Sequence, residues 1–174
     1  MAVGISGYAA YIPKLRSKRD EYAKAWGSCS AAGVNEKSVL GFDEDALTSA
    51  VKVSKRALES ASLAPEKITR FALASTSAPY TEKLLSGTVI VSVGIPNNAF
   101  STDHTTSTRA GTEAFLASIE HVVANPSGRA LVAAADAPTA SMWDPIEHAL
   151  GAGAAAFVLS NENPIAEIEG WSSY

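Results

Sequence analysis

Short apolar runs alternate along this chain with longer segments in which apolar residues recur every three or four positions. These runs predict strands at residues 3–12, 70–75, 129–135 and 153–160, of which 70–75 and 129–135 are expected to be buried, and residues 99–103 predict another strand. Another run, at 165–170, follows a polar turn at 161–164 and predicts a closing hairpin. The pattern therefore predicts a sheet whose strands are separated by segments of helical length.

Most segments between these runs have the spacing of amphipathic helices. Residues 18–26, 43–62 and 112–124 are predicted to be helical, and acidic residues at the start of the second suit its positive end. Residues 87–94 are ambiguous. Their Thr-Val-Ile-Val run favours a strand by propensity, whereas their place between two strands favours a crossover helix. Residues 28–41 are small and polar and predict a surface loop.

Strands that alternate with helices predict an α/β fold. We expect a mixed, mostly parallel five-stranded sheet with helices on both faces, in which the closing hairpin supplies the antiparallel part. The 174 residues contain no linker-like stretch, so residues 1–174 are predicted to form a single domain.

Charge and cysteine content narrow the classes of function. The net charge is −4 and Lys and Arg do not cluster, which argues against a nucleic-acid partner. Cys29 is the single cysteine, so a disulfide framework is excluded and a reducing compartment is expected. The first residues do not read as a signal peptide, and the apolar runs are too short to span a bilayer. We expect a soluble cytoplasmic protein with no membrane partner.

The candidate chemistry centres on residues 107–112, which read Ser-Thr-Arg-Ala-Gly-Thr between a predicted strand and a predicted helix. A turn of this kind can aim one side chain at a thioester, and a cysteine thiolate is the usual nucleophile there. Thr108 stands four residues before Thr112 instead. It is either an unusual nucleophile or, the interpretation we favour, a residue that keeps the turn without acyl transfer.

Several further segments carry a family likeness when they are taken together. They are GISGYAAYIP at 4–13, EKSV at 36–39, DED at 43–45, STSAPY at 75–80, RAGT at 109–112, and 147–157 with its GAAAF strand. With these segments the chain resembles, from end to end, the archaeal-type 3-hydroxy-3-methylglutaryl-CoA synthases, which are members of the thiolase superfamily. The resemblance implies a thiolase-like half-fold, the N-terminal one of two similar halves with the active site between them.

The same resemblance assigns roles to individual residues. It maps the acyl-accepting cysteine of the family to Thr108 and the general acid/base glutamate to Thr76, and it leaves the catalytic histidine to the other half. Thr76 could orient a carbonyl, but it cannot replace a glutamate in proton transfer. Tyr80 is either a proton donor or, slightly favoured, an aromatic residue at the pocket wall. Arg109 either binds a CoA phosphate or is a solvated residue at a helix start.

Other candidate groups carry weaker signals. Asp103, His104 and Ser107 are the residue types of a serine triad, but neighbours in sequence seldom converge in space. Cys29 lies in a loop of small residues with no nearby cation, which indicates an incidental thiol. The spacing of the histidines does not indicate a metal site.

These expectations leave three hypotheses. In the first, the chain is a non-canonical subunit that lacks the catalytic cysteine and completes an acyl-CoA-handling complex with a second thiolase-like chain or a full-length homologue. In the second, it is a catalytic subunit for cysteine-independent retro-aldol cleavage or acyl transfer on a CoA thioester, together with a small OB-fold, zinc-ribbon protein. In the third, it is a fragment of a longer synthase-like protein. A CoA thioester is the expected ligand, with no covalent cofactor.

Overall fold

The computed structural model describes residues 3–29, 33–105 and 107–172. Its elements, in chain order, are β1 (Gly4–Tyr11), β2 (Leu15–Lys18), α1 (Arg19–Trp26), β3 (Glu36–Val39), α2 (Ala46–Ser60), β4 (Arg70–Ala74), α3 (Leu85–Val93), β5 (Phe100–His104), α4 (Ala110–Ala124), β6 (Ala130–Asp136), β7 (Gly153–Ser160) and β8 (Ala166–Glu167). Short 3₁₀ turns at Pro65–Lys67 and Pro145–Ala149 complete the set.

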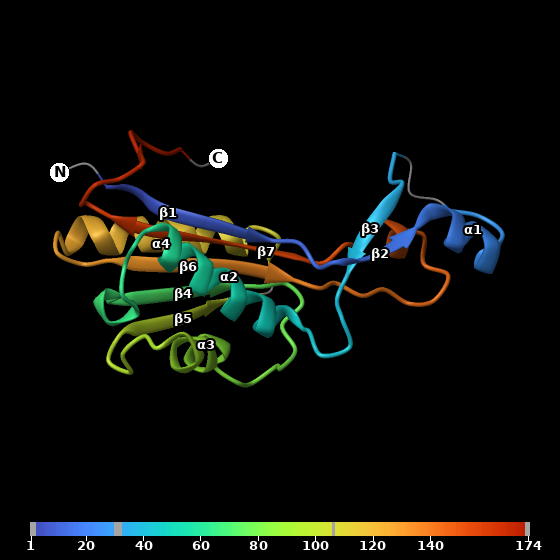
Figure 1. Ribbon diagram of the computed structural model, residues 1–174, viewed down its shortest axis with the longest axis horizontal. Helices are drawn as coiled ribbons and strands as arrows, with labels where there is room; N and C mark the ends of the chain where they lie inside the picture. The colour runs from blue at the N-terminus through green and yellow to red at the C-terminus, as the bar shows by residue number, and fades with distance from the viewer. Residues whose placement is uncertain (1–2, 30–32, 106, 173–174) are drawn as a thin grey trace.

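One mixed sheet organises the fold, with the strand order β5-β4-β6-β7-β1-β8 (Figure 1). Strand β4 runs parallel to β5 and β6, and β7 lies antiparallel between β6 and β1. The predicted α/β class is confirmed, but within the described residues the sheet has six strands rather than five. The predicted closing hairpin is wrong, because β8, which lies within the segment 165–170, pairs with β1 and not with β7. The mixed character of the sheet therefore comes chiefly from β7.

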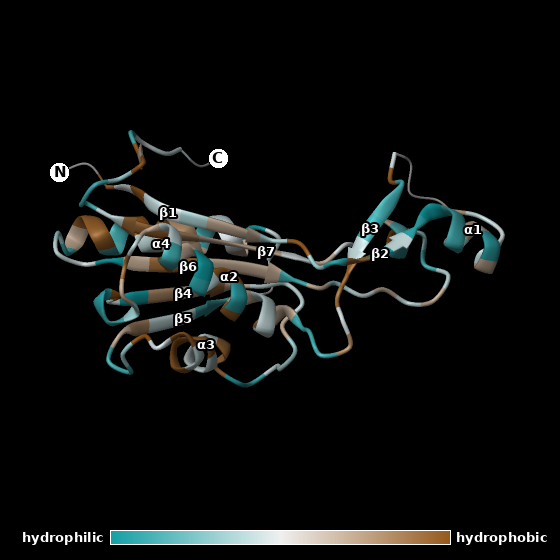
Figure 2. Cartoon of the chain, viewed as in Figure 1, coloured by the Kyte–Doolittle hydropathy of each residue, from teal (hydrophilic) through white to brown (hydrophobic). Residues whose placement is uncertain are grey.

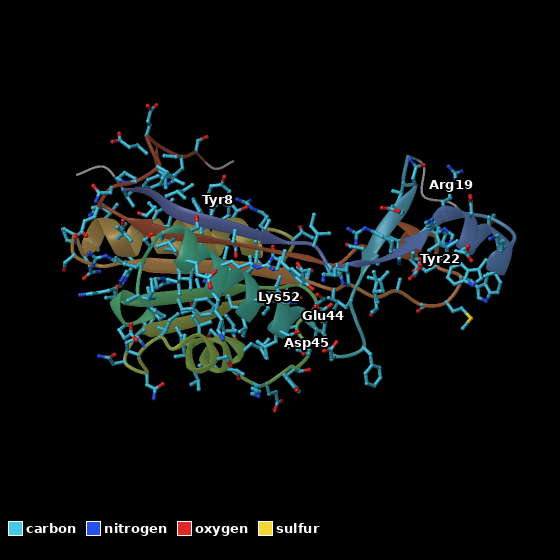
Figure 3. The ribbon with its side chains drawn as sticks, viewed as in Figure 1. Tyr8, Arg19, Tyr22, Glu44, Asp45 and Lys52 are labelled. Atoms are coloured by element: carbon cyan, nitrogen blue, oxygen red, sulfur yellow. The ribbon has the colours of Figure 1, made fainter. Side chains whose placement is uncertain are left out.

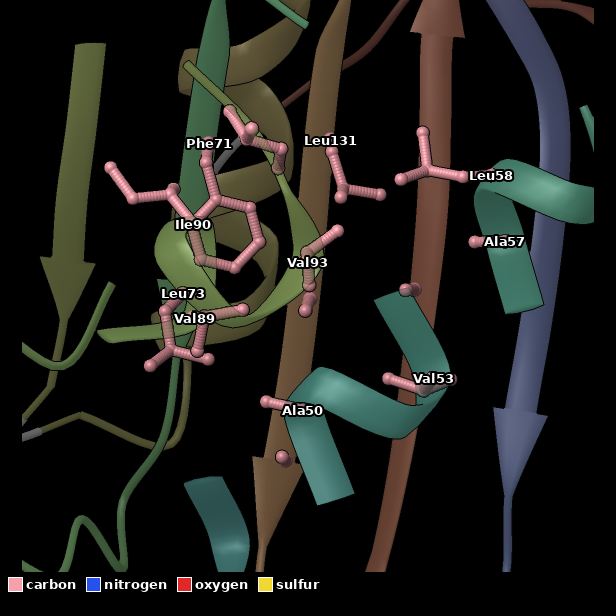
Figure 4. Packing of buried hydrophobic residues seen from close by; sticks show 14 of the residues in the cluster. Ala50, Val53, Ala57, Leu58, Phe71, Leu73, Val89, Ile90, Val93 and Leu131 are labelled. Atoms are coloured by element: carbon pink, nitrogen blue, oxygen red, sulfur yellow. The ribbon is translucent and has the colours of Figure 1, made fainter. Parts of the chain in front are cut away.

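Helices cover both faces of the sheet, as predicted. On one face, α2 and α3 pack on alternate residues of the central strands, including Phe71, Leu131 and Val158 (Figure 4). On the other face, α4 places Ala110 and Ala114 against Ala72 and Ala74 of β4. Small side chains at this second contact let the α4 backbone lie close to the sheet. Figure 2 shows that α3 is among the most apolar parts of the chain.

The ambiguous residues 87–94 lie in a helix, α3, which begins at Leu85. Leu85, Val89, Ile90 and Val93 are buried against the sheet, and burial of this face outweighs the strand propensity of β-branched residues. The position of the segment between two parallel strands was therefore the better guide. A crossover of this kind is how adjacent parallel strands are joined.

The predicted surface loop at 28–41 is wrong for part of its length. Residues 36–39 form β3, which pairs antiparallel with β2, and together with α1 this hairpin makes an arm that projects from the sheet (Figure 1). The sequence of β3, Glu-Lys-Ser-Val, is largely polar and does not show the apolar pattern from which a strand is predicted. Lys37 joins the arm to the 3₁₀ turn at Pro145–Ala149, because its ammonium lies 2.7 Å from the Glu147 carboxylate.

A polar cluster holds the base of the arm to the body. The Tyr11 hydroxyl donates to the Glu44 carboxylate, and the Lys52 ammonium lies over the Tyr11 ring. Lys52 also lies 3.0 Å from the same Glu44 oxygen, and Figure 3 shows these two side chains near the start of α2. These contacts, the Tyr11 hydrogen bond first among them, lower the pKa of Glu44 to about 2. Asp45 next to it begins α2 with a reciprocal cap, in which its carboxylate accepts from the Thr48 N–H at 2.7 Å.

Candidate functional site

The candidate residues gather where the parallel strands β4, β5 and β6 end. Thr76 follows β4, the turn with Thr108 follows β5, and Asp136 is the last residue of β6. The carboxyl ends of parallel strands meet at one edge of the sheet, where ligands of α/β proteins usually bind. The topology therefore brings together the two threonines that the sequence analysis singled out.

Asp136 organises the segment after β4. Its Oδ1 accepts hydrogen bonds from the backbone N–H groups of Thr76 at 2.7 Å and Ser77 at 2.9 Å. The hydroxyls of Ser77, Ser75 and Thr76 donate to the same oxygen at 2.8, 3.1 and 3.2 Å. The carboxylate thus fixes the path of the backbone at Thr76. Sequence reasoning missed Asp136, although a lone acid at the end of an apolar strand was a usable signal.

Thr108 and Arg109 lie in the turn before α4, and both side chains are exposed. The Arg109 N–H donates to the Ser107 hydroxyl at 3.1 Å, and α4 begins at Ala110 without a side-chain cap. The first amides of a helix have no intrahelical acceptor, so this end of α4 suits an oxygen that gains negative charge. Thr108 therefore stands at a position from which a side chain could meet a substrate.

The serine-triad arrangement does not form. Asp103 points to the α3 face of the sheet, where its carboxylate caps that helix by accepting from the N–H groups of Leu85 at 2.7 Å and Ser86 at 2.8 Å. His104, the next residue of the strand, faces the opposite side, as strand alternation requires. Its Nε2 lies 3.3 Å from the Thr102 hydroxyl. Burial first, and the nearby Arg70 cation second, lower the pKa of His104.

The remaining predicted residues lie apart from this edge or on its margin. Tyr80 is half exposed in the segment after β4, and the Lys83 ammonium lies 4.9 Å from its ring centre. Cys29 follows α1 in the arm and carries a free thiol. Within the described residues, no group of His, Cys, Asp and Glu side chains could hold a metal ion. None of the described helices is long and apolar enough to cross a membrane.

An apolar groove of about 380 Å³ runs from the start of α4 across the sheet. Its lining residues are Gly111, Thr112, Phe115, Val132, Ala134, Ala155 and Phe157. Phe115 and Phe157 meet edge to face with ring centres 5.5 Å apart. Beyond them, Tyr8 of β1 stands opposite Phe157 of β7 in the sheet register and is 59% exposed. This face is therefore open on β7 and β1, beside α4.

A second hollow of about 400 Å³ separates the arm from the segment that follows Asp136. Tyr22, Lys37 and Glu147 line it on one side, and residues 137–140 line it on the other. Its position next to the strand ends makes it the natural continuation of the candidate site. The Lys37 ammonium is its buried cation, and it already contacts Glu147.

Comparison with known proteins gives relatives that align with almost the whole of this chain. Hydroxymethylglutaryl-CoA synthases of Archaeoglobus fulgidus and Pyrobaculum arsenaticum are 37% and 33% identical over 177 and 179 aligned residues. These alignments cover 99% and 100% of this chain but 51% of each relative. The chain therefore spans about half the length of the curated relatives it matches. No family model matches the chain.

Solved structures give the same fold. A crystal structure of an HMG-CoA synthase complexed with CoA superposes with a TM-score of 0.84 at 25% identity, covering 94% of this chain and 43% of that one. The 3-oxoacyl-(acyl carrier protein) synthase III of Pseudomonas aeruginosa superposes with a TM-score of 0.85 over 98% of this chain, at 20% identity. The fold is thus thiolase-like, and the chain is a homologue of hydroxymethylglutaryl-CoA synthases over about half their length.

Proposed function

We propose that this homologue of hydroxymethylglutaryl-CoA synthases acts as a half-fold subunit, which joins a second thiolase-like chain to form an acyl-CoA-handling complex. The second chain would carry the other half of the fold or be a full-length homologue. The observation that carries the proposal is the open apolar face beside α4, in a chain that matches about half of each relative. The half-fold would complete the acyl-CoA pocket and stabilise the assembly.

The open face has the character of an interface core. Phe115 and Phe157 lie at the centre of its groove, and the largely exposed Tyr8 extends it over β1. Contiguous exposed apolar surface of this kind usually marks a protein interaction site. Aromatic residues bury a large area and often dominate the binding energy at interfaces. A partner that packs on this face would lie directly beside the strand ends with Thr76 and Thr108.

The chemistry of the strand ends favours a partner that supplies catalytic groups. We infer that Thr108 takes the place of the acyl-accepting cysteine of the synthases and that Thr76 takes the place of their acid/base glutamate. Two hydroxyls at these positions offer hydrogen bonds but neither a thiolate nor a group that exchanges protons near neutral pH. Tyr80, at the margin of the site, could add a proton donor. The catalytic histidine would come from the partner.

A CoA thioester is the ligand that this arrangement suits. One structural relative is complexed with CoA. In this chain, the start of α4 and the exposed Arg109 could meet an anionic group of the thioester. The hollow beside the arm could receive the extended part of the ligand. No covalently bound cofactor is needed for any of these contacts.

Asp136 supports the alternative, a cysteine-independent enzyme subunit for retro-aldol cleavage or acyl transfer on a CoA thioester. Such a reaction needs a proton acceptor, and Asp136 places a carboxylate beside Thr76. Its Oδ1 is occupied by five donors, so proton transfer would use Oδ2. A small OB-fold, zinc-ribbon protein would be a fitting partner in this case.

The test is co-purification of the untagged chain with identification of any bound thiolase-like chain by mass spectrometry. We expect Tyr8→Lys to release the partner while the chain keeps its circular dichroism spectrum. Val91→Lys is the matched control, because Val91 is also largely exposed and lies on α3, on the opposite face. Retention of the partner by Tyr8→Lys, or its loss in both variants, would contradict the proposed interface.

Turnover of a CoA ester by the reconstituted complex separates the two functions. If the chain only completes the pocket, Asp136→Asn should lower turnover no further than its effect on stability explains. If Asp136 is the proton acceptor, the same substitution should reduce kcat by at least about a hundredfold, which is the usual contribution of a positioned general base.

A further inference from the structure

The hollow of about 400 Å³ lies between two parts of the chain that leave the sheet, the arm and the segment 137–152. We propose that the arm, formed by β2, α1 and β3, is a lid over this hollow, and that the Lys37–Glu147 ion pair is the latch that holds it shut. The ligand beneath the lid is the CoA thioester of the proposed function, so the proposal rests on that function for its ligand alone. The latch depends on contacts of the arm and is tested without a ligand.

The arm is joined to the sheet layer by two single stretches of chain. These are residues 12–14, which follow β1, and residues 40–45, which precede α2. Figure 1 shows that the arm stands clear of the helices that cover the sheet. Helix α1 buries none of its residues, and the residues of β2 and β3 are partly or fully exposed. Elements with few buried apolar contacts open at a small cost in free energy, and lids are drawn from such elements.

The base of the arm is fixed, which makes the two stretches a pivot. The Tyr11 hydroxyl and the Glu44 carboxylate form a hydrogen bond between the last residue of β1 and the stretch before α2. This bond brings the two stretches together where they leave the sheet layer. The arm can therefore turn about its base without disturbing the packing of α2.

One ion pair holds the arm against the segment 137–152. Among the described residues, Lys37 and Glu147 form the one ion pair that joins the arm to the rest of the chain. The Lys37 ammonium lies 2.7 Å from the Glu147 carboxylate and donates to the Glu147 carbonyl at 2.6 Å. The Lys37 side chain is only 8% exposed. A buried charge that loses its partner is strongly destabilising, so the closed position depends on this carboxylate.

Two hydrogen bonds beside the latch also have to break when the arm turns away. The Ala152 N–H donates to the Ser38 carbonyl at 3.1 Å, and the Ser38 hydroxyl donates to the Ala152 carbonyl. Ser38 belongs to β3, whereas Ala152 is the residue before β7. The Ala152 amide therefore has its acceptor on the arm, and its protection from solvent reports the position of the lid.

The aromatic contact between the two parts holds a strained residue. Trp26 of α1 stacks on Trp143 with ring centres 5.2 Å apart. Trp143 has a φ of 70°, which lies in the left-handed region and is rare for a bulky side chain. Strain of this kind persists only while the surroundings impose it, and it is found at ligand clamps and switch regions. When Trp26 moves away, Trp143 is free to relax, which lowers the cost of opening.

A ligand in the hollow favours the closed position. Ser17 and Tyr22 of the arm line the hollow, and so do residues 137–140 of the opposing segment. A ligand that contacts both parts binds the closed arrangement more tightly than the open one and shifts the equilibrium toward closure. A closed lid also shields the neighbouring strand ends from water.

Hydrogen exchange of the Ala152 amide, followed by NMR, tests the lid. In the wild-type chain we expect this amide to exchange faster than that of Val132, which lies in the buried strand β6 and is exposed only when the sheet opens. Glu147→Gln should accelerate exchange at Ala152 at least about tenfold, because it leaves the Lys37 ammonium without a counterion. Lys37→Gln removes the other partner and should have the same effect. Exchange at Val132 should stay unchanged in both variants.

A control and a ligand complete the experiment. Lys24→Gln breaks the exposed ion pair with Glu21 in the same arm and should leave exchange at Ala152 unchanged. Coenzyme A is the probe for the ligand. Its addition to the wild-type chain should slow exchange at Ala152, because the closed lid is then favoured.

Three results would overturn the proposal. The first is a wild-type Ala152 amide that exchanges as slowly as that of Val132, because the arm would then open only with the sheet. The second is exchange at Ala152 that neither Glu147→Gln nor Lys37→Gln accelerates, or that both accelerate no more than at Val132. The third is coenzyme A that binds, as calorimetry shows, without slowing exchange at Ala152. If one variant does not fold, the other decides. Coenzyme A that does not bind would contradict the ligand of the proposed function, and the two variants would still decide the lid.

Discussion

Replacement of Asp136 is the sharpest perturbation that the candidate site offers. In the folded chain, its Oδ1 accepts from the backbone N–H groups of Thr76 and Ser77 and from nearby hydroxyls. Asp136→Ala removes the acceptor and leaves these donors to water. Asp136→Asn keeps an acceptor of the same shape and removes the charge. The pair of variants therefore separates the hydrogen bonds from their ionic part.

The geometry fixes the expected size of the effect. A hydrogen bond to a charged group contributes ~1.5–3 kcal/mol, and neutral ones contribute about 1 kcal/mol. The segment is partly exposed and water can replace the hydroxyl contacts, so we count the two backbone donors at the lower value. Asp136→Ala should then lower the free energy of unfolding by about 3 kcal/mol, and Asp136→Asn by about 1 kcal/mol. For a chain of this size, about 3 kcal/mol corresponds to a Tm lower by about 6–12 °C.

Urea denaturation of the two variants and the wild type measures these differences. Glu82→Ala is the control, because it removes an equal charge from an exposed position in the segment before α3 and should change stability by less than about 0.5 kcal/mol. Amide exchange should accelerate at Thr76 and Ser77 in Asp136→Ala. The reasoning is refuted if Asp136→Ala costs less than about 0.5 kcal/mol, or if Asn and Ala cost the same.

Three further substitutions test the packing and the arm. Gly7→Ala would bring a methyl group 2.6 Å from the Ala61 backbone nitrogen, and calorimetry should show a loss of about 1–3 kcal/mol because the α2 backbone must then move; an unchanged stability would contradict this close contact. Phe71→Ala should cost about 3–5 kcal/mol in urea denaturation because the ring is fully buried, whereas Phe42→Ala, at an exposed ring, should be nearly neutral; equal losses would contradict the assigned core. The Glu44 pKa of about 2 lies below its ordinary value of 4.5, so the stabilisation lost in Glu44→Gln should be full above pH 4.5 and fade as pH falls toward 2. A difference between wild type and Glu44→Gln that does not shrink in acid would contradict this assignment.

The sequence predicted the body of the fold because its central strands, β4 and β6, are buried on both faces. Continuous apolar runs such as 70–75 and 129–135 leave little choice of structure, and β4 and β6 formed there. The helix of the arm was predicted at 18–26, but its strands were not, because β3 is polar and pairs only with β2 and so lacks the period that burial imposes. The pairing of β8 with β1 escaped for another reason, since a partner strand cannot be read from one strand's own residues.

The candidate site was predicted in part. The position of Thr76 and Thr108 at neighbouring strand ends follows from the alternation of strands and helices, and this alternation is visible in the pattern of apolar residues along the sequence. The network around Asp136 could not be derived, because it depends on how two segments about sixty residues apart meet. The roles of Asp103 and His104 were decided by strand alternation, which sends their side chains to opposite faces. Only the three-dimensional structure shows what each then contacts.

Native mass spectrometry of the untagged protein from its own cells decides whether another chain completes this half-fold. We predict a complex that contains the 18.0 kDa chain together with a second thiolase-like chain, identified by its peptides. A preparation that contains only the 18.0 kDa chain or multiples of it, at every salt concentration, would contradict the claim that this half-fold is completed by another chain.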